Sequence, residues 1–89
     1  MSVHTDFASA IDGALGTIDR AIANEMRTVD GGSAESQLAN LRAELHAART
    51  RGAITPEELR TMIRAVAKWA PDDDVSLLSS LGVIARARG

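Results

Sequence analysis

Three breaks divide this 89-residue chain into four segments with helical apolar spacing. The breaks are Gly31-Gly32, Gly52 and Pro71, residue types that end helices because glycine is flexible and proline lacks a backbone N–H. Within the segments, apolar residues recur every three or four positions, and no stretch alternates between apolar and polar residues with period two. The sequence therefore predicts an all-α protein without strands.

The predicted helices form one domain over residues 1–89 and span about 5–29, 34–50, 56–70 and 74–87. Short links join the first helix to the second and the third to the fourth, which is typical of a small four-helix bundle built from two αα-hairpins. The first helix is long, roughly 37 Å at a rise of about 1.5 Å per residue. Its end could project from the bundle or pair with a second copy of the chain.

The first helix has Thr5 or Asp6 as its predicted N-cap and an apolar stripe on one face. The stripe consists of Phe7, Ile11, Ala14, Leu15, Ile18, Ile22 and Val29. Gly13 and Gly16 either weaken this helix, by about 1 kcal/mol each relative to alanine, or allow another backbone to approach closely.

The second helix has Ser33 as its predicted N-cap and Gly52 at its end. Its apolar seam consists of Leu38, Leu41, Leu45 and Ala48. The small residues Ala39, Ala43 and Ala47 form a second face, which predicts that this helix packs closely on both sides.

The third helix has the clearest start signal in the chain. Thr55 stands at the N-cap, Pro56 at the first helical position and Glu58 at the third, and Ile54 and Leu59 can close a hydrophobic staple around them. The predicted core residues that follow are Leu59, Met62, Ile63, Val66 and Ala70, and those of the fourth helix are Val75, Leu77, Leu78, Leu81, Ile84 and Ala85.

These helices can build a core with only a few large apolar side chains. Hydrophobic residues make up 45% of the chain, but sixteen of those forty residues are alanine, and only Phe7 and Trp69 are aromatic. Burying alanine removes little apolar area from water, and small domains bury a small fraction of their surface. We therefore expect the core to be completed by a protein partner or by self-association into a homodimer.

Composition also excludes several classes of function. With no cysteine there is no disulfide, no thiolate zinc site and no cysteine nucleophile. The net charge of −2, spread along the chain, disfavours nucleic-acid binding. The apolar stretches are too short for a membrane span and no signal peptide is present, so we expect a cytoplasmic protein without a membrane partner.

No pattern in the sequence nominates catalysis, so we expect no enzyme, no catalytic residue, no cofactor and no metal. Ser2-Val3-His4 could hold Cu²⁺ or Ni²⁺ only if Met1 were removed, and His46 reads as a surface residue. The run from Asp72 to Asp74 lacks the glycine and the distant glutamate of a calcium loop, which favours helix capping.

The sequence therefore predicts a small protein-interaction module, an adaptor, accessory or regulatory subunit that docks stoichiometrically onto a partner. The residues predicted to contact the partner are Trp69, Met62, Met26, Val29, Arg60, Arg64 and Lys68. Trp69 is either an anchor for the partner or the residue that closes one end of the core.

Two alternatives stay open. An inhibitor of a bacterial defence complex, encoded by a phage or another mobile element, fits the same description. A weak nucleic-acid-binding protein would require the cations of the second and third helices to share one face. Those cations are Arg42, Arg49, Arg51, Arg60, Arg64 and Lys68.

Overall fold

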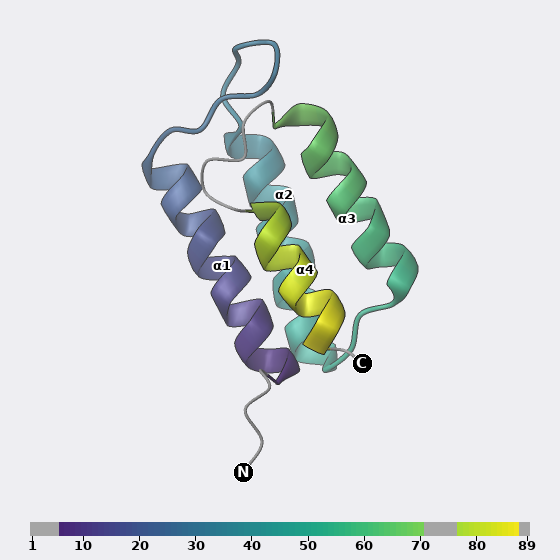
Figure 1. Ribbon diagram of the computed structural model, residues 1–89. Coiled ribbons are helices and arrows are strands. Elements are labelled where there is room, and N and C mark those ends of the chain that lie inside the picture. Colours follow the sequence, from purple (N-terminus) through teal and green to yellow (C-terminus); the bar gives the residue numbers. More distant parts are fainter. Residues whose placement is uncertain (1–5, 71–76, 88–89) are drawn as a thin grey trace.

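Four helices make up the fold, as the apolar spacing predicts. In the computed structural model, which describes residues 6–70 and 77–87, they are α1 (Phe7–Ala23), α2 (Glu35–Arg51), α3 (Pro56–Trp69) and α4 (Leu77–Ala87) (Figure 1). Within those ranges the only β-type pairing is an isolated bridge between Arg27 and Ser33. The all-α fold class is confirmed.

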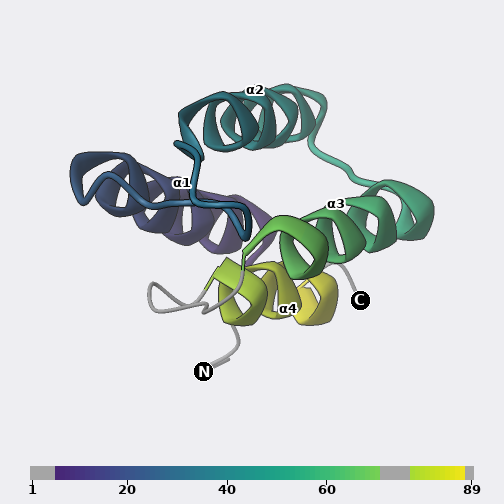
Figure 2. The same cartoon turned by 90° about the horizontal axis from the view of Figure 1, so that it is seen from above.

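The helices pack as two hairpins around α1 and α4. α1 packs against α2 and α4, and α4 packs against α1 and α3. Viewed from above, the four helices form a ring in which α2 and α3 face each other without close packing, although they follow one another in the chain (Figure 2). The predicted hairpins are confirmed, and the bundle they form is open between α2 and α3.

The core fills the inside of this ring with one contiguous cluster of apolar side chains. The predicted seam of α2, from Leu38 to Ala48, is buried throughout. The second face of α2 is not covered: Ala39, Ala43 and Ala47 are exposed, so the prediction that α2 packs on both sides is wrong. The reason is that this face lies on the side of α2 opposite the buried seam, and Ala39 and Ala43 line neither hollow between α2 and α3.

The first helix is shorter than predicted because it ends in a Schellman turn after Ala23. The N–H of Met26 donates to the carbonyl of Ala21 at 3.1 Å, and the N–H of Glu25 donates to that of Ile22 at 3.0 Å. Glu25 has φ of 53°, the left-handed conformation in which glycine is the usual residue. The prediction of a helix to residue 29 is therefore wrong, and no glycine marked the true end.

The segment 24–34 then folds back onto the bundle. Its turn is closed by a hydrogen bond from the Thr28 N–H to the Gly32 carbonyl at 2.8 Å. The side chain of Thr28 is buried and bonds to the carboxylate of Asp30, which, with the Gly32 N–H, lowers the pKa of Asp30. The N–H of Val29 donates to the carbonyl of Trp69 at 2.8 Å, so a hydrogen bond joins this segment to the C-terminal end of α3.

The helix caps agree with the sequence in part. The Asp6 carboxylate accepts the Ser9 N–H at 2.7 Å, as predicted, whereas Thr5 lies outside the described residues. The N-cap of α2 is Ala34, so the prediction of Ser33 as N-cap was wrong by one residue. The Ser33 hydroxyl still accepts the N–H of Glu35 at 3.2 Å. Gly52 ends α2 with φ of 79°, as predicted.

The start of α3 follows the prediction closely. The Thr55 hydroxyl accepts the Glu58 N–H at 3.0 Å, and the Glu58 carboxylate accepts the Thr55 N–H at 3.0 Å. Ile54 and Leu59, the two residues of the expected staple, are both buried. The capping box thus fixes where α3 begins and how it leaves the link from α2.

One further prediction concerns the glycines of the first helix, and several others fall on residues that the structure does not describe. A Cβ at Gly13 would meet no described atom within 4 Å, so the close-approach interpretation has no support there. His4, the run from Asp72 to Asp74 and Val75 lie outside the described residues, as does the predicted start of the fourth helix.

The Schellman turn after α1 generates the first testable prediction. Glu25→Gly should raise the free energy of unfolding by about 1 kcal/mol, because glycine adopts positive φ without the steric cost that a Cβ imposes. Urea denaturation monitored by circular dichroism measures the change. Asn24→Gly is the matched control: Asn24 has φ of −88°, so glycine there should not stabilise the protein. Equal stabilisation by both substitutions would contradict the assignment.

Candidate docking groove between helices two and three

The open side of the bundle contains a hollow between α2 and α3. Its volume is about 270 Å³, and side chains of both helices line it. The lining residues are Gln37, Asn40, Leu41 and Glu44 from α2, and Thr61, Met62, Ala65, Val66 and Trp69 from α3. The hollow exists because α2 and α3, although consecutive in the chain, do not pack closely against each other.

A second hollow of about 410 Å³ continues the first toward the link between the two helices. The two share Glu44, Thr61 and Met62, and the second adds Ala47, Arg51, Thr55, Glu57 and Glu58. We call the continuous depression the α2–α3 groove. It extends alongside α3, whose 14 residues correspond to about 20 Å.

The floor of the α2–α3 groove belongs to the protein core. Leu41, Met62 and Val66 are 6%, 5% and 1% exposed. Thr61 and Ala65, on the α3 wall, are exposed and small. A floor anchored in the core resists collapse, and small side chains on a wall allow another backbone to approach. The floor of the groove is therefore held by the packing of the core, and its α3 wall carries little bulk.

Trp69 lies at the end of the groove opposite the link. Its side chain is half-buried, packs against the core and also lines the groove. Its backbone carbonyl is held by the N–H of Val29. The two interpretations of Trp69 are thus compatible in space, because one face of a large aromatic side chain can pack inward while the other meets the groove.

The opposite end of the groove carries the charged side chains. Arg51 of α2 pairs with Glu58 of α3 at 3.1 Å, and the Glu58 carboxylate also accepts the Thr55 N–H. These contacts, with the backbone hydrogen bond from Thr55 the largest, lower the pKa of Glu58. Glu44 and Glu57 make no ion pair or side-chain hydrogen bond with the described residues.

The structure brings together only some of the predicted partner-contact residues. Met62 and Trp69 both line the α2–α3 groove. Met26 and Val29 lie on the segment 24–34 and not in the first helix, which was predicted to reach residue 29, so that placement was wrong. Met26 is half-buried beside a separate hollow of about 180 Å³, and Val29 is 65% exposed.

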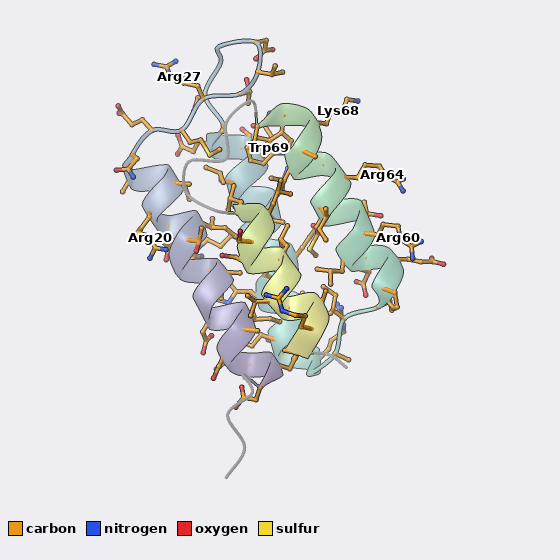
Figure 3. The ribbon with its side chains drawn as sticks, viewed as in Figure 1. Arg20, Arg27, Arg60, Arg64, Lys68 and Trp69 are labelled. Atoms are coloured by element: carbon orange, nitrogen blue, oxygen red, sulfur yellow. The ribbon has the colours of Figure 1, made fainter. Side chains whose placement is uncertain are left out.

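The cations of α2 and α3 do not form one face. Arg42 pairs with Asp19 at 2.9 Å, and Arg49 pairs with Asp12 at 2.7 Å, so both arginines join α2 to α1. Arg60, Arg64 and Lys68 instead project from the outer side of α3 (Figure 3) and make no ion pair with the described residues. The shared face required α2 and α3 to pack side by side, which they do not.

Several groove residues were missed by sequence reasoning. Gln37 and Asn40 carry no pattern that distinguishes them from other polar positions of α2, and Ala65 reads as one alanine among many. Leu41 and Val66 were predicted as core, which they are, but their position under an open groove depends on the spacing of two helices. No local signal in the sequence reports that spacing.

The described part of the chain shows neither a cluster of metal ligands nor a membrane-spanning helix. No group of three or more histidine, cysteine, aspartate or glutamate side chains gathers there to hold a metal ion. None of its helices has the length and apolar character needed to cross a membrane. Comparisons with protein-family models, with curated proteins and with solved structures each returned no match.

The groove end at Glu58 generates a pH prediction. Because folding lowers the pKa of Glu58 below its ordinary value of 4.5, its charge stabilises the folded state above pH 4.5, and this contribution is lost as the pH falls through the lowered pKa. Glu58→Gln should therefore be less stable than the wild type near pH 7, with the difference vanishing in acid. Denaturant titrations at several pH values measure this.

The same substitution in a Thr55→Ala background provides the control. Thr55 supplies the hydroxyl half of the capping box, so its removal should reduce the effect of Glu58→Gln. A pH-independent difference between wild type and Glu58→Gln would contradict the assigned role of the carboxylate.

Proposed function

We propose that this protein is a non-catalytic interaction module that binds a helical segment of a partner protein in the α2–α3 groove. The observation that carries the proposal is the open side of the bundle: two helices that do not pack together leave a groove with a core-anchored apolar floor. Binding an amphipathic helix in a hydrophobic groove is a recurrent mode of protein recognition.

The dimensions of the groove support a helical occupant. A groove that follows the 14 residues of α3 matches a helix of three to four turns. Exposed Thr61 and Ala65 present little bulk on the α3 wall, and half-buried Trp69 offers the type of side chain that anchors many interfaces. The partner helix would thus complete the fourth side of the ring.

The mode of action would be stoichiometric docking, whether the consequence is assembly or inhibition. An adaptor and an inhibitor of a defence complex would use the groove in the same way, and the identity of the partner separates them. Self-association into a homodimer stays a prediction from the alanine-rich composition.

A substitution that fills the groove tests the proposal. Ala65→Arg places a long charged side chain on the exposed α3 wall, so it should abolish recovery of the partner from cells of the source organism while leaving the fold intact. Recovery is measured by affinity capture with quantitative mass spectrometry, and the fold by circular dichroism.

Ala67→Arg is the matched control, because Ala67 is exposed on the same helix and does not line the groove. It should recover the partner like the wild type. If a stoichiometric partner is recovered equally by wild type, Ala65→Arg and Ala67→Arg, the groove is not its docking site.

Nucleic-acid binding is the second candidate, and one observation favours it. Arg60, Arg64 and Lys68 recur every fourth residue on the outer side of α3 and are not neutralised by any described acid. Such a row could contact successive phosphates, although the net charge of −2 opposes it.

Fluorescence anisotropy with a labelled DNA duplex and a labelled RNA separates the two candidates. With the groove as the functional site, we expect no binding to either at about 50 mM salt, a condition that favours electrostatic contacts. Binding that is lost in Arg60→Glu/Arg64→Glu and retained in Ala65→Arg would instead support the nucleic-acid candidate.

A further inference from the structure

Charge is distributed unevenly along the α2–α3 groove. Near Trp69, the polar lining consists of the neutral amides of Gln37 and Asn40. Toward the link between the helices, the lining changes to the carboxylates of Glu44, Glu57 and Glu58 and the guanidinium of Arg51. The groove therefore has a neutral end and an acidic end, and a helix bound along it meets both.

Two of the three carboxylates form no ion pair with any residue that the structure describes. Arg51 and Thr55 satisfy Glu58, which leaves Glu44 and Glu57 without an ion pair or side-chain hydrogen bond among the described residues. Arg60, which is close to Glu57 in sequence, does not pair with it and points away from the bundle (Figure 3). Elsewhere on α2, Arg42 and Arg49 are already paired with aspartates of α1.

Covering these two carboxylates has an energetic consequence. A helix in the groove would remove water from Glu44 and Glu57, which is unfavourable unless the helix supplies cations in return. An acidic helix would also be repelled. The apolar floor alone would bind any helix with an apolar stripe. The two carboxylates favour those helices that also carry basic residues.

We propose that the occupant of the groove is an amphipathic helix with basic residues on both flanks of its apolar stripe, at the end that meets Glu44 and Glu57. Both flanks are required because Glu44 lies on the α2 wall and Glu57 on the α3 wall. This inference rests on the proposed function, since it specifies the chemistry of the partner helix at the same groove.

A displayed peptide library tests the inference with the full-length protein. The library consists of 16-residue helices with a fixed leucine stripe and with lysine, glutamate or glutamine allowed at each flanking position. Binders are selected on the wild type and depleted on Ala65→Arg. We expect the enriched helices to carry lysine on both flanks at one end, and to bind Ala67→Arg like the wild type.

Reversal of the groove charge provides the second arm. The enriched lysine helices should bind at least tenfold more weakly to Glu44→Lys/Glu57→Lys, and selection on that variant should enrich glutamate at the same positions. Glu44→Gln/Glu57→Gln, which removes the charge without adding bulk or repulsion, should weaken binding to an intermediate extent. Circular dichroism confirms that each variant is folded before it is used.

The outcomes separate the inference from the proposed function. Binders that depend on Ala65 but show no enrichment of lysine would overturn the charge inference and leave helix docking intact. A library in which no binder depends on Ala65 would overturn both. Light scattering after size exclusion tests a second copy as the occupant: a dimer that Ala65→Arg dissociates and Ala67→Arg preserves would also overturn the basic-helix inference.

Discussion

The packing of α1 against two helices at once is the constraint on which the rest of the structure depends. α1 contacts both α2 and α4, and it contributes buried isoleucines together with buried alanines at positions 10, 14 and 21. Alanines allow neighbouring helices to approach closely, and the larger side chains fill the space between them. Because α1 and α4 hold the two hairpins together, α2 and α3 are neighbours in the ring without having to pack against each other.

Polar contacts between elements reinforce this arrangement. The buried hydroxyl of Thr17 in α1 lies 3.1 Å from that of Ser80 in α4, and the ion pairs of Arg42 and Arg49 join α2 to α1. The side chains of these ion pairs are about half exposed, so each pair contributes little to stability. They also use two cations that would otherwise be available to a partner.

The open side of the bundle follows from the same packing. A small domain with few large side chains buries a small fraction of its surface, and here one pair of helices is left without close packing. Here the unclosed pair is α2 and α3, and its groove combines an apolar floor with two carboxylates that form no ion pair within the described part of the chain. This surface leaves apolar side chains open to contact and carboxylates without an ion pair. One basic amphipathic helix would supply both the apolar contact and the positive charge.

The sequence by itself determined the local features of this protein. The capping box at Thr55, the glycine that ends α2 and the buried seam from Leu38 to Ala48 follow from propensities and spacings that act over one or two helical turns. Four helices, and their pairing into hairpins, were therefore predictable. The candidate site was predictable only in part, through Met62 and Trp69.

Tertiary structure decided the rest. Glu25 adopts the left-handed conformation without being glycine, because the segment 24–34 returns to bond with the end of α3, and this ended α1 six residues early. Exposure of Ala65 beside a buried Val66, and the position of Glu44 and Glu57 on two walls of one groove, depend on the distance between α2 and α3. That distance is set by how α1 and α4 pack, an interaction between residues far apart in the chain that no local pattern encodes.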